Sequence, residues 1–266
     1  MIKQGCAFVY ARLVELWKYR EMLWSMILSE LRTRYRGSFL GFLWTFINPL
    51  LTLMVYTFIF SRIMKVTMPH YALFMFIGLL AWNLFATGIQ SSASVIVRQG
   101  SLVKKIYFPR EILPLSVVGG SVINYLLSLV ILVPFLFING YYPTVNWLYV
   151  PLILLMEMIF TVGLALLLSS LTVYLRDIEH MLGIFLMLWF YLTPVIYSLK
   201  ILSPGIAQMF KLNPMSDVVL SFQSTLYYNE SPHWKLFLYG YGISVVVLIF
   251  GWWLFTRLNR RFAEEV

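Results

Sequence analysis

The residues that could carry chemistry are few and far apart in the sequence. Glu157 is the only ionisable side chain well inside a long apolar segment, where an unpaired charge costs roughly 3 kcal/mol or more. Such a carboxylate could relay protons in an ion-coupled carrier, but we favour a protonated or hydrogen-bonded group that holds helices together or faces a wet pore. His70, His180 and His233 lack the spacing of a metal site. We therefore expect no metal ion and no catalytic residue in this chain.

The motifs of nucleotide hydrolysis and nucleophilic catalysis are missing from the sequence. A phosphate-binding loop needs a Gly-Lys pair, and the chain contains none. No nucleophile-elbow motif occurs either. Cys6 is the only cysteine, so an internal disulfide is impossible. Asp177 and Glu179 are too sparse for the carboxylate-rich loop that a membrane glycosyltransferase would need. We expect no enzyme activity and no bound cofactor in this chain itself.

Composition indicates an integral membrane protein. Hydrophobic residues make up 61% of the chain and charged residues 12%, whereas a soluble domain has about 25% charged residues. A net charge of +9 could indicate nucleic-acid binding, but the basic residues gather at the ends of apolar stretches, as they do in membrane proteins. We expect a lipid bilayer as the partner, and no nucleic acid.

Six apolar segments are long enough to cross a bilayer, which takes about 20 residues. The longest uncharged run, 112–156, exceeds one crossing, and Asn139, Gly140 and Pro143 favour a turn near its middle. The sequence thus predicts an all-α protein with six transmembrane helices. The predicted spans are about 37–61, 71–97, 112–138, 147–175, 181–198 and 236–256.

The basic residues predict the orientation of these spans. Fifteen of the 20 Lys and Arg residues fall on the side that holds both termini, and five fall on the other side. Because cytoplasmic loops carry the excess of Lys and Arg, both termini should be cytoplasmic. Residues 1–36 would form a cytoplasmic segment, 37–256 the membrane domain and 257–266 a cytoplasmic tail.

Apolar residues recur at helical spacing between residues 8 and 36, with polar residues on the opposite ridge. This pattern predicts an amphipathic helix in the cytoplasmic interface. Periodicity alone favours a simple anchor over a docking surface for a partner. The residues assigned to this helix are Leu13, Trp17, Trp24, Leu28, Arg32 and Arg34.

The cytoplasmic connection between the second and third spans contains a second candidate docking element. Leu102 and Ile106 lie one helical turn apart, and Pro109 would end the helix. A plain loop would satisfy the cytoplasmic excess of Lys and Arg with lysines alone. The apolar and aromatic residues in this segment instead favour a short element that docks on a partner. Its residues are Leu102, Lys104, Lys105, Ile106, Tyr107, Phe108, Pro109 and Arg110.

The external connection 199–235 is too long for a simple turn. Pro204 and Pro214 can each begin a helix, and an apolar stripe follows the second proline. Two short re-entrant helices fit this pattern, and helices lying flat on the membrane surface fit it equally well.

Four separated motifs resemble those of ABC-2 type permeases that export polysaccharide. They read ELRTRYRGSFLGFLW at residues 30–44 followed by NPL at 48–50, FPREILP at 108–114, TPVIYS at 193–198, and NP at 213–214. The motifs follow the family's order and extend over nearly the whole chain. The resemblance implies a homodimer joined to two copies of a separate ABC ATPase subunit, which binds ATP and Mg. It also implies that the helix at 101–109 sits in a cleft of that ATPase, with the N-terminal amphipathic helix beside it.

The family's cargo is a cell-surface polymer on a polyprenyl pyrophosphate carrier, such as O-antigen, capsular polysaccharide or wall teichoic acid. Its members sit in the bacterial cytoplasmic membrane and pass the polymer between two copies, with the first and fifth helices beside a lateral opening. Aromatic rings in the spans could line that path, because the C–H face of a sugar stacks on a ring, although most such rings simply pack. A carrier driven by an ion gradient through Glu157 is the alternative function. The candidate channel residues are Trp44, Tyr56, Trp82, Phe85, Trp189 and Tyr191.

Overall fold

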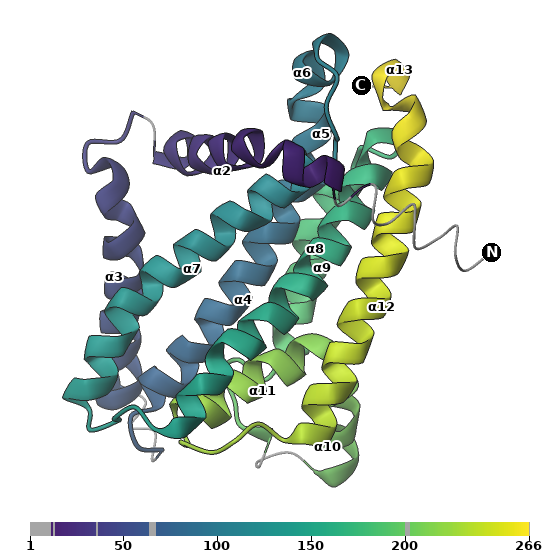
Figure 1. Cartoon of the computed structure of the whole chain (residues 1–266). Coiled ribbons are helices and arrows are strands. Elements are labelled where there is room, and N and C mark those ends of the chain that lie inside the picture. The colour runs from purple at the N-terminus through teal and green to yellow at the C-terminus, as the bar shows by residue number, and fades with distance from the viewer. Residues whose placement is uncertain (1–11, 13, 36, 64–67, 200–202, 266) are drawn as a thin grey trace.

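The computed structural model describes residues 12, 14–35, 37–63, 68–199 and 203–265. Every regular element in these ranges is a helix, and no strand occurs among them, so the prediction of an all-α fold is confirmed. Within the described ranges, five segments are apolar and long enough to cross a membrane (Figure 1). They are Gly41–Phe58, Tyr71–Ala93, Ile112–Ile138, Val145–Tyr174 and Trp234–Arg261.

These five segments are built mainly from α-helices with short irregular ends. The irregular ends are the 3-10 turns η1 (Gly41–Leu43), η3 (Val145–Tyr149) and η5 (Asn259–Arg261) and the π-helical turn η2 (Ile59–Ile63). The α-helices are α3 (Trp44–Phe58), α4 (Tyr71–Ala93), α7 (Ile112–Ile138), α8 (Val150–Tyr174) and α12 (Trp234–Leu258).

Three of the predicted spans differ from the structure by more than two residues at an end. The sixth continues to Arg261 rather than ending at residue 256. The first begins at Gly41 rather than at residue 37, because Gly37 has a φ angle of +79°, which a helix does not accommodate. The second ends at Ala93 rather than at residue 97, because Ser94 has φ −97° and ψ 1° and breaks the helix. The chain then continues as α5 (Val95–Arg98) and α6 (Gly100–Lys105).

The fifth predicted span, 181–198, is not a long helix. The structure has α9 (Asp177–Tyr191) there, with 15 residues, which reaches roughly 22 Å at 1.5 Å per residue and falls short of a hydrocarbon core of about 30 Å. Turns follow from Leu192 to the end of the TPVIYS motif. Pro194 contributes to this early stop because the residue before a proline disfavours the helical conformation. The structure therefore supports five long spans plus a shorter α9.

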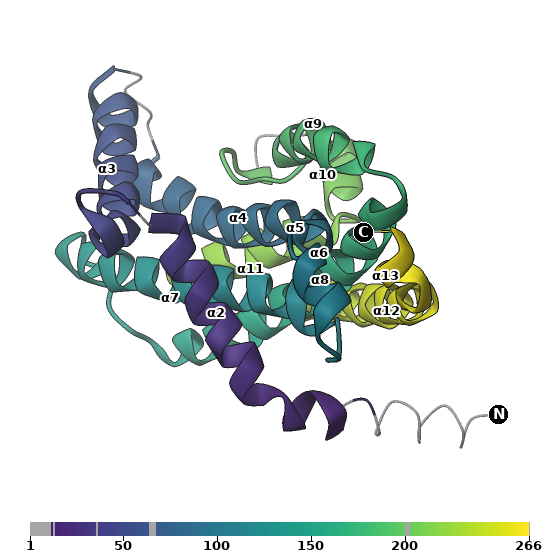
Figure 2. The same cartoon turned by 90° about the horizontal axis from the view of Figure 1, so that it is seen from above.

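A long helix, α2 (Arg20–Tyr35), lies across one end of the bundle (Figures 1 and 2). The same end holds α6 and α13 (Phe262–Glu265), and we call it the basic end because it carries Lys104, Lys105 and Arg260. The contact of α2 with α7 is close, since a Cβ added at Gly119 would lie 2.7 Å from Ile27 Cδ1. Because Gly119 and Gly120 have no side chains, α2 can pack closely on α7 at this position.

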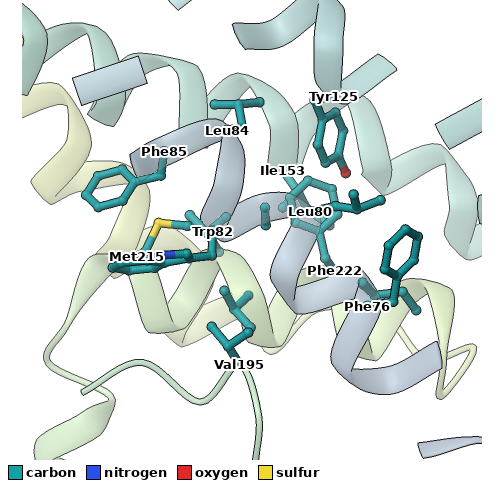
Figure 3. Packing of buried hydrophobic residues seen from close by; sticks show 14 of the residues in the cluster. Phe76, Leu80, Trp82, Leu84, Phe85, Tyr125, Ile153, Val195, Met215 and Phe222 are labelled. Atoms are coloured by element: carbon teal, nitrogen blue, oxygen red, sulfur yellow. The ribbon is translucent and has the colours of Figure 1, made fainter. Parts of the chain in front are cut away.

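Both helices predicted in the 199–235 connection are present, as α10 (Pro204–Phe210) and α11 (Pro214–Leu226), and each begins at its proline. The apolar stripe of α11 is buried against α4, α8 and α12, so it faces protein rather than lipid or the membrane surface. Figure 3 shows Met215 of this stripe near Trp82 of α4, and Phe222 near Leu80 of α4 and Tyr125 of α7. The end of the bundle opposite the basic end is therefore closed by α11.

Asn213 joins the two proline motifs at this opposite end. Its side-chain oxygen accepts hydrogen bonds from Trp189 Nε1 and from the backbone N–H of Met215, each at 3.0 Å. Its Nδ2 donates to the Leu192 carbonyl and to Thr193 Oγ1, also at 3.0 Å. One amide side chain therefore satisfies the end of α9 and caps the start of α11, which explains why these motifs occur as a pair.

The backbones of α8 and α12 touch directly. A Cβ added at Gly251 would lie 2.1 Å from the carbonyl oxygen of Gly163, and one added at Gly163 would lie 2.7 Å from the backbone nitrogen of Leu248. A third glycine, Gly88, allows a similarly close contact between α4 and α8, since a Cβ added there would lie 2.9 Å from Thr161 Cγ2. Small residues allow such close crossings in membrane proteins, and here they lock the central helices together.

Candidate functional site

The loop after α4 projects from the basic end as the predicted docking element, but its helix is shorter than predicted. Helix α6 ends at Lys105, and Ile106 is extended with φ −128° and ψ 137°. The prediction that the helix runs to Pro109 is wrong. A proline disfavours the helical conformation in the residue before it, and here the chain leaves the helix earlier so that Phe108 can turn back into the bundle.

The residues of this loop divide into an exposed tip and a buried root. Tyr107 is 84% exposed and Ile106 55%, and Lys104 and Lys105 are exposed beside them. Phe108 is only 5% exposed and packs in an apolar cluster with α7, α8 and α12. Pro109 is also buried and Leu102 is half-buried. A partner could therefore contact the tip, while the root is fixed inside this chain.

Arg110 ties the root to the end of the last span. Its Nη1 donates to the backbone carbonyl of Asn259 and, at 3.1 Å, to the Asn259 side-chain oxygen. The guanidinium also lies 5.9 Å from the ring centroid of Phe262, which is fully buried. Charged hydrogen bonds of this kind are worth about 1.5–3 kcal/mol. Movement of the loop would therefore carry the end of α12 with it.

A polar cavity of about 290 Å³ lies beside this loop. Tyr107 and Arg110 form one wall, and Arg12, Glu15 and Arg260 face them. Arg12 Nη1 lies 2.8 Å from Glu15 Oε2 in an ion pair. The cavity therefore joins the segment before α2, the loop after α6 and the end of α12 at one place.

The carboxyl group of Glu111 is buried at the start of α7. Burial raises its pKa, while the nearby charges of Arg12 and Arg110 act in the opposite direction. The basic end therefore contains a carboxyl group that this chain shields from solvent.

The predicted interface residues do not all behave alike. Trp17 and Trp24 are 70% and 54% exposed, as amphipathic anchoring requires. The contact with α7 instead uses Ile27 and Leu31, which are buried. Of the other predicted interface residues, Leu28 is half-buried and Arg32 is exposed, whereas Leu13 and the side chain of Arg34 lie outside the described part of the chain.

A second cavity, of about 300 Å³, lies between α3, α4 and α7 within the spans. Trp44, the first residue of α3, lines it, so one predicted channel residue does face a cavity. Sequence analysis missed the rest of the lining, although Asn48, Asn83 and Asn124 were visible as three amides inside apolar segments. Most of the lining side chains with polar atoms carry hydroxyl or amide groups.

The remaining channel candidates do not line this cavity. Trp82 and Phe85 are 6% and 0% exposed, and Trp189 packs edge-to-face on Phe85 at 5.0 Å between ring centroids. Tyr56 is half-buried near Phe60, and Tyr191 is 57% exposed on α9. In this structure Trp82 and Phe85 are core residues, because α4 turns this face toward α8, α9 and α11.

The whole arrangement matches one protein family. The family model described as ABC-2 type transporter matches residues 21–227, from α2 to the end of α11. The chain belongs to the ABC-2 type transporter family. A similar protein is the O-antigen export system permease protein RfbA of Myxococcus xanthus, 38% identical over 254 residues, which cover 95% of this chain and 98% of the relative. A protein of the same name from Klebsiella pneumoniae is 33% identical over 237 residues, or 89% and 91% of the two chains.

Membership of the ABC-2 family confirms the resemblance of the four sequence motifs and bears on Glu157. This residue of α8 is fully buried, and neither carboxyl oxygen has a hydrogen-bond partner among the described residues. No cluster of His, Cys, Asp or Glu in the described ranges could hold a metal ion. Among the described residues, the structure therefore shows no hydrogen-bonded chain for a proton relay through Glu157.

Proposed function

We propose that this chain is the membrane subunit of an ATP-driven exporter of O-antigen polysaccharide across the bacterial cytoplasmic membrane. Family membership and the similarity to O-antigen export permeases over nearly the full length support this proposal. Two copies of the chain would assemble with two copies of an ABC ATPase subunit, which binds ATP and Mg. The polymer would travel on a polyprenyl pyrophosphate carrier, and the basic end, with both termini, would face the cytoplasm.

The proposed mechanism depends on the two parts of the docking segment at residues 102–110, its exposed tip and its buried root. The exposed tip, Ile106 and Tyr107 with the two lysines before them, would fit the ATPase cleft. The root would pass a push from the ATPase to two long helices, because Phe108 packs on α7 and Arg110 holds the end of α12. Since α12 touches α8 through backbone atoms, the three helices would tilt together.

The polymer would pass between the two copies, with α3 and α9 beside a lateral opening for the lipid carrier. Figure 2 shows these two helices on either side of α4, so that all three bound one side of the molecule. Trp44 and Tyr56 of α3 and Tyr191 of α9 would face that side, and Trp189 would support α9 from behind through its contact with Phe85.

The test is to replace Tyr107 with alanine in the complex with its ATPase. The substitution should leave the fold intact, because the Tyr107 side chain is exposed. We expect copurification of the ATPase to weaken, or export of O-antigen to the cell surface and polymer-stimulated ATP hydrolysis to fall together. Tyr142→Ala is the matched control, since Tyr142 is 64% exposed at the opposite end of the bundle. Unchanged assembly, hydrolysis and export in Tyr107→Ala would contradict this coupling role.

A further inference from the structure

We propose that the cavity between α3, α4 and α7 is a binding site for an uncharged sugar unit of the exported polymer. This inference rests on the proposed function and narrows its cargo to a polymer that presents neutral sugar residues. At about 300 Å³ the cavity is at the small end of the usual range for ligand sites. It would therefore hold a short piece of glycan at a time.

The lining of the cavity has many polar groups and no charge. Nine side chains with a hydroxyl or amide group come from three helices, and among the described residues that line the cavity there is no Lys, Arg, Asp, Glu or His. Asn83 and Thr87 of α4 are exposed at the cavity, and Thr45 and Asn124 lie deeper on α3 and α7. Hydroxyl and amide groups complement sugar hydroxyls, which both donate and accept hydrogen bonds.

Several of these polar atoms still lack partners. Thr45 is 4% exposed, and its hydroxyl has no hydrogen-bond partner among the described residues; both amide atoms of Asn124 are shielded from solvent and likewise have none there. A buried polar group left unpaired costs about 1–3 kcal/mol. By contrast, Thr87 Oγ1 donates to the Asn83 carbonyl at 2.6 Å and Ser121 Oγ donates to the Val117 carbonyl at 3.2 Å. Thr45 and Asn124 line the cavity, and a rotation of their side chains would bring these shielded atoms to a bound sugar.

Three aromatic side chains, Trp44, Phe76 and Tyr125, also line the cavity. Trp44 is half-buried at the start of α3, and Tyr125 lies on α7, next in sequence to Asn124. A sugar ring offers an apolar C–H face to such side chains and directs its hydroxyls to the surrounding amides. Rings and uncharged hydrogen-bonding groups in one cavity are the combination that carbohydrate recognition needs.

Other occupants fit this lining less well. A lipid tail would offer no hydrogen bonds to a lining with nine hydroxyl or amide side chains, which is unfavourable in a membrane. A phosphate of a teichoic-acid-type polymer needs cationic or clustered N–H donors, and the lining contains no basic residue. The chemistry of the site therefore favours a neutral glycan over an anionic polymer.

Binding can be measured with the full complex in lipid nanodiscs by saturation-transfer NMR. The probes are the neutral oligosaccharides mannotetraose and chitotetraose, and an oligomer of glycerol phosphate serves as the anionic comparison. We expect saturation transfer to at least one neutral probe, and to the anionic probe no more than to empty nanodiscs. Failure of both neutral probes to bind, or stronger binding of the anionic oligomer, would overturn the proposal.

Substitutions then locate the site. Asn124→Leu should weaken neutral-probe binding about tenfold, because two hydrogen bonds of roughly 0.7 kcal/mol each are lost. Asn83→Leu should weaken it too, and the fold should tolerate this change because Asn83 is exposed. The matched control is Asn139→Leu at the far end of α7, where the amide donates to the Phe135 carbonyl outside the cavity. Equal effects of Asn83→Leu and Asn139→Leu would place the probe elsewhere and refute the site.

Export measurements separate this proposal from the function on which it rests. Normal O-antigen export by Asn83→Leu and Asn124→Leu, with loss of export in Tyr107→Ala, would refute the sugar site and leave the exporter intact. A wild-type complex that exports no O-antigen under ATP would instead refute the proposed function. Loss of export in the cavity variants with normal ATPase assembly would support both.

Discussion

The direct backbone contact of α8 and α12 can be tested by a single methyl group. In Gly251→Ala the new Cβ would lie 2.1 Å from the Gly163 carbonyl oxygen, whereas real Cβ atoms essentially never approach another heavy atom closer than 3.0 Å. Both partners in this clash are helix backbone, so no side-chain rotation can relieve it. The two helices would have to separate by about 1 Å, a gap that forfeits a quarter to a half of the dispersion energy at each contact.

The expected loss of stability follows from two opposing effects. Overpacking a tight contact costs about 1–3 kcal/mol, and a rigid backbone clash belongs near the upper value. Alanine is about 1 kcal/mol better than glycine within a helix, which leaves a net destabilisation of about 2 kcal/mol. For a chain of 266 residues, this free-energy change lowers Tm by about 4–8 °C.

Thermal unfolding of the purified protein in detergent, followed by tryptophan fluorescence, measures this shift. Gly242→Ala is the matched control, because Gly242 is in the same helix and a Cβ there would meet nothing within 4 Å. It should leave Tm unchanged or raise it by about 2–4 °C. Gly163→Ala approaches the contact from the other helix and should destabilise as Gly251→Ala does. Equal Tm values for Gly242→Ala and Gly251→Ala would refute the close crossing.

Three further substitutions test other parts of the structure. Burial raises the pKa of Asp217 in α11 to about 8 from 3.8, against a smaller opposing effect of Lys211. Between these two pH values the folded state keeps a proton that the unfolded state releases, so the stability of the fold should decrease as pH rises from about 4 to 8. Asp217→Asn should remove that pH dependence of Tm, and parallel curves for the two proteins would contradict the assignment. Trp189→Phe keeps a ring against Phe85 but loses the hydrogen bond to Asn213 at 3.0 Å, so Tm should fall by about 2–4 °C. An unchanged Tm would contradict the role of the Asn213 side chain in joining α9 to α11. Glu157→Gln preserves the shape of the side chain and removes its ionisable group, so ATP-driven export should continue with the same pH profile. A pH-dependent loss of transport would instead support the ion-coupled carrier.

Helix positions were largely predictable because they depend on local composition. Apolar runs and turn residues predicted the all-α fold and four long helices to within a few residues, and Pro204 and Pro214 marked the first residues of α10 and α11. The errors occurred where tertiary contacts compete with local pattern. The helix after Gly100 ends at Lys105 because Phe108 gains a buried place against α7 and α8, and no spacing rule expresses that gain.

The candidate site was harder to predict from the sequence than the helices, because its chemistry depends on which helices are neighbours. Sequence periodicity gave no reason to separate Trp44, which lines the polar cavity, from Phe85, which is fully buried against Phe160 and Trp189. Asn48, Asn83 and Asn124 belong to three different helices, and each amide alone is an ordinary polar residue in a span. Only the packing of α3 and α7 against α4 brings them to one cavity. In an apolar chain with so few charges, uncharged polar side chains that converge from separate helices are therefore a better guide to a polar cavity than the many aromatic rings.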